Sequence, residues 1–203
     1  LTTVGTGQYV ISPADADDAI VRRIVDAAAV PDLLGRETAA ALLEASAADC
    51  TVIYVRLAGD DVRVIATAGC EPDAGRTMAR SAANGNAYGR GAIVIEPLGR
   101  DAEGPRFGLV ASPRPIGHPV MRRLRMIAAV ARQGFALCAA RDRKVRAIEL
   151  EPQSFRHRSS LGMFYSAFQE PEAALTAYRQ AIDLKPNSNY AWNNLGGVLL
   201  KME

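Results

Sequence analysis

The segment "AIELEP" at residues 147–152 returns almost unchanged as "AIDLKP" at residues 181–186. The prolines that end the two segments, Pro152 and Pro186, stand 34 positions apart. A fixed period of about 20 to 50 residues is typical of architectures built from stacked repeats. We therefore expect other residues near the C-terminus to recur in the same register.

Residues 155–188 form one complete unit of this period. Small residues stand where two helices would cross closely, tyrosines stand where space beside the crossing must be filled, and a proline stands where the second helix must end. The signature residues are Leu161, Gly162, Tyr165, Ala174, Tyr178, Ala181 and Pro186. A further unit begins at Asn189, and its Trp192 should pack back on the complete unit. The pattern closely resembles the tetratricopeptide repeat (TPR), apart from Arg158 and Leu199, where that family prefers Trp and Tyr.

The TPR resemblance implies a protein or peptide partner, because in that family the first helices of successive units line a concave binding groove. An asparagine at position 6 of a unit can hold a peptide backbone there, which implicates Asn194. Ser160, Tyr190 and Asn193 lie beside it in the repeat register. Ordinary repeat packing is the competing interpretation for each of these four residues.

An incomplete unit precedes the complete one. Ala147 and Pro152 occupy positions 27 and 32 of that unit, whereas Lys144 stands where position 24 favours an aromatic residue. The segment "AARDRKVRAIEL" contains neither Gly nor Pro, so we expect continuous helix from about residue 120 to about residue 150. The repeats would share that helix with a different, preceding domain.

Before the repeats, the sequence predicts two helices, two strands, a short helix with a loop rich in Gly and Asn, two more strands and the long helix. Their ranges are 12–30, 32–48, 51–57, 62–69, 74–90, 92–98, 106–113 and 120–150. The first strand pair predicts an antiparallel hairpin with Leu57 opposite Val62. Val64 would then share a covered apolar face with Ile53, and Tyr54 would lie on the opposite face.

This order of elements resembles the GAF family of sensor domains over roughly residues 31–143. The segments "IVRRIVDAAAVPDLLGRETAAALLEASAADCTVIYV" and "MIAAVARQGFALCAARDR" look like the opening and closing helices of GAF domains in bacterial signalling proteins, including enhancer-binding transcription regulators. The resemblance implies an α+β fold, in which a GAF-like antiparallel sheet is flanked by helices and followed by an all-α TPR segment. We divide the chain into an N-terminal segment and helix at 1–30, the sensor domain at 31–143 and the TPR segment at 144–203.

The GAF resemblance further implies a homodimer formed through the terminal helices, and a small molecule bound between the sheet and the connection at 74–90. Met78, Arg80 and Tyr88 would lie near that ligand, with Tyr54 on the sheet. GAF domains share no invariant ligand motif, so no cofactor is assigned.

Charge gives no case for nucleic acid or an acidic membrane, because the formal net charge is only +2 on 203 residues. Direct nucleic-acid binding is not expected, since the basic residues of the long helix read as a solvated face: Arg122, Arg123, Arg125, Arg132, Arg141, Arg143, Lys144 and Arg146. No apolar run is long enough to span a membrane. The three cysteines lack the spacing of a zinc site or a disulfide framework, which favours the cytoplasm.

Cys50 and Cys70 bracket the predicted hairpin. In the register above, Cys50 faces Gly69, so Cys70 would lie on the other side of the sheet and both would be small buried residues. A one-residue bulge would reverse that geometry. His118 and His157 have no neighbours that read as a catalytic triad or a metal pair, so we expect no catalytic residues and no metal site.

These observations predict a non-enzymatic signalling module, in which a GAF small-molecule sensor or dimerisation domain is coupled through a shared helix to a TPR protein-binding surface. Such modules occur in transcription regulation. The alternative is the N-terminal, non-catalytic part of a larger enzyme, such as a TPR-bearing glycosyltransferase or a kinase. A GAF reductase with thiol-dependent activity is a third alternative.

Overall fold

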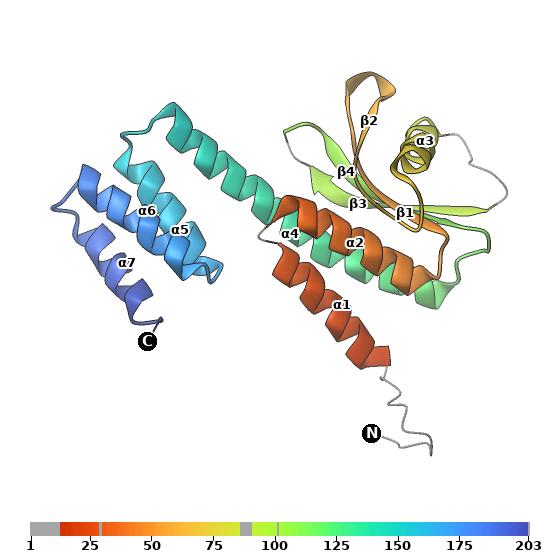
Figure 1. Cartoon of the computed structure of the whole chain (residues 1–203), viewed down its shortest axis with the longest axis horizontal. Helices are drawn as coiled ribbons and strands as arrows, with labels where there is room; N and C mark the ends of the chain where they lie inside the picture. Colours follow the sequence, from red (N-terminus) through yellow and green to blue (C-terminus); the bar gives the residue numbers. More distant parts are fainter. Residues whose placement is uncertain (1–12, 29, 86–90, 101, 203) are drawn as a thin grey trace, which may run out of the picture. The chain divides into compact units, whose positions relative to one another are not determined.

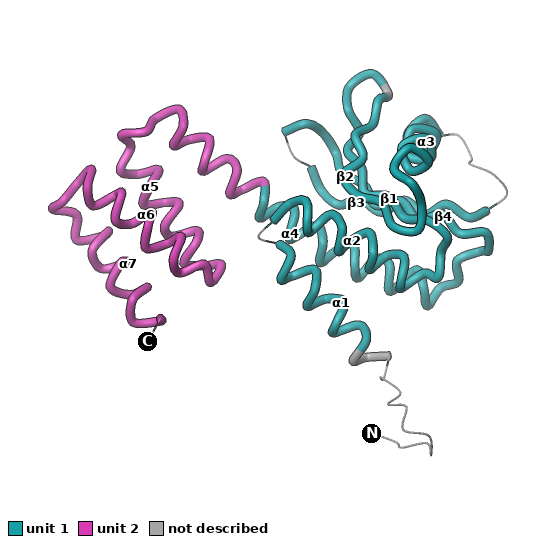
Figure 2. The backbone as a smooth tube through the Cα atoms, in the orientation of Figure 1, with its two compact units in different colours: residues 1–138 teal, residues 139–203 magenta. Residues whose placement is uncertain are grey.

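The computed structural model describes residues 13–28, 30–85, 91–100 and 102–202. The chain divides into two compact units, residues 1–138 and 139–203, which are described separately (Figure 2). The division falls inside one helix, α4 (His118–Leu150), between Cys138 and Ala139. The boundary predicted from the sequence lies five residues further on, after residue 143.

Unit 1 is a four-stranded antiparallel sheet with helices on both faces (Figure 1). Its strands lie in the order β2-β1-β4-β3, with β1 at Cys50–Arg56, β2 at Val62–Ala68, β3 at Ala92–Arg100 and β4 at Pro105–Ser112. A short 3-10 turn, η1 (Ala58–Asp60), joins the first two strands. The helices of this unit are α1 (Pro13–Ala27), α2 (Pro31–Ser46), α3 (Pro72–Ala83) and the first part of α4. The predicted antiparallel sheet flanked by helices is therefore confirmed.

The larger core of unit 1 lies between the sheet and the helices α1, α2 and α4. It is built from buried aliphatic and aromatic side chains, among them Ile20, Ile24, Leu34, Leu42, Ile53, Leu98, Val110, Leu124, Ile127 and Phe135. The buried Thr51 hydroxyl on β1 donates a hydrogen bond of 2.7 Å to the carbonyl oxygen of Ala39 on α2. Helix α1 contributes Ile20 and Ile24 to this core.

The pairing of β1 with β2 differs from the prediction in its outer half. Ile53 pairs with Ala66 as predicted, but the register then shifts at Ile65, and Tyr54 pairs with Val64. This bulge turns Val64 away from the face of Ile53 and onto the face of Tyr54, which α3 covers. The expectation of a hairpin covered on one face only is therefore wrong, and Tyr54 is 2% exposed.

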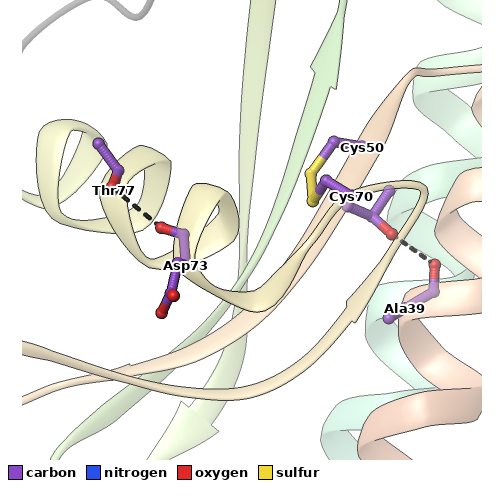
Figure 3. Close-up of a disulfide and its surroundings, with 6 residues drawn as sticks. Ala39, Cys50, Cys70, Asp73 and Thr77 are labelled. Atoms are coloured by element: carbon purple, nitrogen blue, oxygen red, sulfur yellow. Dashed lines mark hydrogen bonds between the residues drawn. A yellow bond between two sulfur atoms is a disulfide. The ribbon is translucent and has the colours of Figure 1, made fainter.

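The two cysteines that bracket the hairpin form a disulfide, Cys50–Cys70 (Figure 3). The prediction that they lie on opposite sides of the sheet is wrong, because it continued the strand through Gly69. β2 ends at Ala68, and Gly69 turns the chain with a φ of 78°. A Cβ at Gly69 would lie 2.3 Å from the carbonyl oxygen of Asp49, so both the backbone conformation and the close approach favour glycine.

Unit 2 contains the last turns of α4 and the helices α5 (Phe155–Ala167), α6 (Pro171–Leu184) and α7 (Asn189–Leu199). Helices α5 and α6 form the predicted pair of the complete repeat, and α7 begins where the next unit was expected. The uninterrupted course of α4 to Leu150 confirms the predicted continuous helix. Within the described part of the chain, no helix combines the length and apolar character needed to span a membrane.

The core of unit 2 follows the repeat positions. Its buried members are Tyr165, Ala174, Leu175, Ala177, Tyr178, Ile182, Ala191, Leu195 and Val198. Gly162 lies at the crossing of α5 and α6, where a Cβ would come within 2.8 Å of the Tyr178 ring. This confirms the predicted small-residue crossing. Trp192 contacts the complete unit through its indole N–H, which donates to the Pro186 carbonyl oxygen over 2.8 Å, but at 52% exposed it does not enter the core as predicted.

Candidate peptide-binding surface on the repeat unit

The predicted partner-binding residues lie on α5 and α7. Ser160 is on α5, and Tyr190, Asn193 and Asn194 follow one another along the first turns of α7. The Tyr190 hydroxyl reaches back to α5 and lies 3.4 Å from the sulfur of Met163. This contact brings the side of α5 that carries Met163 beside α7.

This α5–α7 face is accessible and chemically mixed. Met163 is 51% exposed and Tyr190 is 49% exposed, so a thioether and a phenol ring are both available to a partner. The Asn194 side-chain amide donates one hydrogen bond of 2.9 Å to the Tyr190 carbonyl oxygen. Its second N–H and its Oδ1 remain a donor and an acceptor, the pair of groups that matches a peptide backbone.

The sequence reasoning missed Met163. Met163 lies three residues after Ser160, but it contacts Tyr190 of α7, whereas Ser160 bonds Lys144 of α4. Asn193 is exposed on α7 beside Asn194. The face therefore combines three predicted residues, Tyr190, Asn193 and Asn194, with one that was not predicted, while Ser160 makes its main contact elsewhere.

A supporting tyrosine lies beneath this surface. Tyr178 of α6 is 1% exposed, and burial raises the pKa of its phenol to about 12, with a smaller contribution from Tyr190. Tyr178 is therefore uncharged at neutral pH and acts as packing between the helices.

Ser160 faces a pocket of 320 Å³ between the end of α4 and the start of α5. The pocket is lined by Ala140, Arg143, Lys144, Ala147, His157 and Ser160. The Lys144 ammonium group donates a hydrogen bond of 2.6 Å to the Ser160 hydroxyl. At the edge, His157 Nδ1 lies 3.6 Å from the Glu151 carboxylate. The lining is thus basic, with alanines between the charged side chains.

The residues predicted to bind a small molecule in unit 1 lie on both sides of the α3–sheet contact. Tyr54 is buried on β1, with its ring centroid 5.6 Å from that of Phe107, and burial raises the pKa of its phenol. Met78 of α3 packs against the same cluster. Tyr88 lies outside the described residues.

Arg80 points away from this cluster and forms an exposed ion pair of 2.6 Å with Asp61. That hydrogen bond holds the pKa of the Asp61 carboxyl below its usual value. Helix α3 lies close against the sheet, because a Cβ built at Gly75 would lie only 2.7 Å from the Thr67 side chain of β2. The described side chains of α3 and the sheet therefore form a packed layer.

Comparison with known proteins supports the repeat assignment. A family model for the TPR repeat matches residues 169–203, which include α6 and α7. No GAF family model matches the chain. No curated protein and no solved structure shows a significant match. The C-terminal helices thus fit the TPR family, whose repeats suggest protein–protein interaction, and the GAF resemblance rests on the sequence pattern alone.

Proposed function

We propose that this chain is a non-enzymatic regulatory module whose repeat unit binds a protein or peptide on the α5–α7 face. The observation that carries the proposal is the TPR match at residues 169–203, together with the exposed side chains that α5 and α7 present side by side. The Asn194 amide would pair with the backbone of an extended segment. Met163 and Tyr190 would contact an apolar side chain next to it.

The role of unit 1 forms a second part of the proposal. We propose a GAF-like sensor or dimerisation domain, linked to the repeats through α4, which continues from one unit into the other. Among the described residues, Tyr54 of β1 and Met78 of α3 pack in one cluster, so a ligand at that place would have to displace them. A thermal-shift screen of the full chain against a metabolite panel tests this, and a ligand that raises the unfolding temperature would identify a sensor instead.

Peptide selection against the full chain tests the binding surface. A displayed peptide library would be selected on the protein, and the enriched peptide would be labelled for fluorescence anisotropy. Asn194→Ala and Tyr190→Ala should each weaken binding about tenfold, the cost of one well-made contact. Asn187→Ala is the matched control, because Asn187 is exposed in the loop between α6 and α7. Unchanged binding by both α7 variants, or a selection without enrichment, would overturn the proposal.

A further inference from the structure

The 34-residue period relates one face of α4 to one face of α6. Ala140, Arg143, Lys144 and Ala147 of α4 correspond to Ala174, Ala177, Tyr178 and Ala181 of α6. Both sets have the spacing i, i+3, i+4 and i+7, so each lies along one side of its helix. The two faces can therefore be compared position by position.

The two faces differ in what covers them. On α6, all four residues are at most 3% exposed, because the first helix of the unit, α5, and the following helix, α7, pack on them. On α4, the four corresponding residues line the pocket of 320 Å³, and Arg143 is exposed. The pocket thus lies on the face of α4 that corresponds to the face of α6 covered by its first helix, α5.

The α4 face lacks a covering first helix because of the residues from which α4 is formed. One period before α5 (155–167), the first helix of the preceding unit would occupy residues 121–133, but those residues are themselves part of α4. The incomplete unit therefore has a second helix and no first helix. Two alanines, Ala140 and Ala147, keep the face shallow enough for a helix backbone to approach, as Ala174 and Ala181 do on α6.

The charge of the pocket decides what kind of helix fits. Arg143 stands where α6 has Ala177, and Lys144 stands where α6 has Tyr178. Within the described part of the chain, neither cation has a carboxylate within ion-pairing distance, and Lys144 bonds only the neutral Ser160 hydroxyl. The carboxylate of Glu151 at the edge is directed to His157. A helix that enters the pocket must bring its own negative charge.

We propose that the pocket between α4 and α5 receives an acidic helix of a partner protein, which takes the place of the absent first helix. One or two carboxylates on the inserted face would pair with Arg143 and Lys144, and small residues between them would lie on Ala140 and Ala147. This site is distinct from the α5–α7 face, and it does not require that face to bind a peptide.

A pair of designed helices tests the proposal on the full chain. The probe is a capped, fluorescein-labelled peptide of about 15 residues, built from Ala, Leu and Gln with Glu at two positions four residues apart. Its matched control has Gln at those two positions. We expect the Glu peptide to bind about tenfold more tightly, the combined effect of two partly exposed ion pairs. Equal affinities for the two peptides would overturn the proposal.

A charge-reversed variant of the protein gives a second test, which compares the preference between two peptides and does not depend on their absolute affinity. Arg143→Glu combined with Lys144→Glu should abolish the preference for the Glu peptide and create a preference for a Lys peptide. Arg179→Glu combined with Lys201→Glu is the control, since it makes the same change of charge at two exposed positions outside the pocket. The control should keep the original preference. If it loses the preference equally, binding follows net charge and the pocket has no role.

Two further measurements distinguish a helix-binding pocket from a small-anion site and from the α5–α7 face. Amide chemical shifts of Ala140 and Ala147 should move on titration with the Glu peptide, and free glutamate should not reproduce the effect. Full competition by free glutamate would mean that the pocket binds a small anion only, which contradicts the proposal. Asn194→Ala should leave binding of the Glu peptide unchanged, so failure of this site and failure of the α5–α7 face give different results.

Discussion

Gly162 is the residue on which the packing of α5 against α6 depends most directly. A Cβ at this position would lie 2.8 to 3.0 Å from three atoms of the Tyr178 ring, and that ring is fully buried. We expect Gly162→Ala to lower the free energy of unfolding by about 1–3 kcal/mol, because overpacking outweighs the better helix propensity of alanine. Urea denaturation followed by circular dichroism measures the change.

Gly197 provides the matched control on α7. Apart from the backbone of α7 itself, no heavy atom of the described residues lies within 4 Å of a Cβ built there, so only helix propensity should act. Gly197→Ala should leave stability unchanged or raise it by up to about 1 kcal/mol. If both alanine variants shift the midpoint in the same direction, the close crossing at Gly162 is not the cause.

Tyr178 should make stability depend on alkaline pH. Its folded pKa of about 12 lies above the ordinary value of 10.0, so the unfolded chain loses this proton at a lower pH than the folded chain. The contribution is therefore complete below about pH 10 and decreases between about pH 10 and 12, by on the order of 1.4 kcal/mol per pH unit. Denaturation of wild type and Tyr178→Phe across this range checks it. Parallel curves for the two proteins would contradict the assignment.

At the level of helices and strands, sequence periodicity was sufficient to locate each element that has regular helix or strand geometry. The apolar spacing of α1, α2 and α4 and the β-rich runs of the hairpin located these elements within a few residues. The bulge at Ile65 was not predictable, because a bulge inserts one residue without changing composition. The turn at Gly69 was read as strand, and this one error also hid the disulfide.

The candidate sites also divide into residues that the sequence predicted and residues that it did not. Asn194, Tyr190 and Asn193 follow from the repeat register, since the period itself places them on one helix face. The pocket beside Lys144 was not predicted, although it depends on a first helix that the incomplete unit lacks. The sequence does show that lack, as the absence of repeat residues between 121 and 133.

The disulfide is the element-level feature with the clearest effect on stability. Cys50–Cys70 closes a loop over a sequence separation of 20 residues and joins the start of β1 to the segment before α3. We expect its removal to lower the free energy of unfolding by about 3 kcal/mol through greater freedom of the unfolded chain. The measurement compares oxidised wild type, reduced wild type and the Cys50→Ser/Cys70→Ser variant. A reduced protein as stable as the oxidised one would contradict this expectation.

For the molecule as a whole, the same bond bears on the predicted cytoplasmic location. Disulfides persist mainly in oxidising compartments, whereas a reducing cytoplasm keeps thiols free. Rapid alkylation of thiols in intact host cells, followed by mass spectrometry of the Cys50 and Cys70 peptides, reports the state directly. Alkylated cysteines would support the cytoplasm, and an intact bond would contradict it.

Self-association is expected from the exposed leucines at the end of α7. Leu199 is 44% exposed and Leu200 is 74% exposed, and Met202 beside them is 41% exposed. Adjacent apolar side chains tend to be buried against another surface. Sedimentation should show a concentration-dependent dimer that Leu199→Glu/Leu200→Glu abolishes. Leu150→Glu is the control, because Leu150 is a single leucine, 76% exposed at the end of α4, and its replacement should leave association unchanged.

A monomer at high concentration would contradict this expectation, and so would an equal effect of the control. Slow amide exchange through Leu199 would be a second contrary result, because it would show that the end of α7 is stable without a covering surface.

The continuity of α4 also has a consequence for synthesis on the ribosome. The helix supplies Leu124, Ile127 and Phe135 to the core of unit 1, and its later residues open unit 2. The nascent N-terminal unit cannot complete its core until residues 118–138 have left the exit tunnel, although its sheet is synthesised earlier. Once that happens, the same helix offers the emerging repeats a preformed surface on which α5 can dock. Translation therefore delivers the two units in a fixed order, with α4 as the last part of one and the first part of the other.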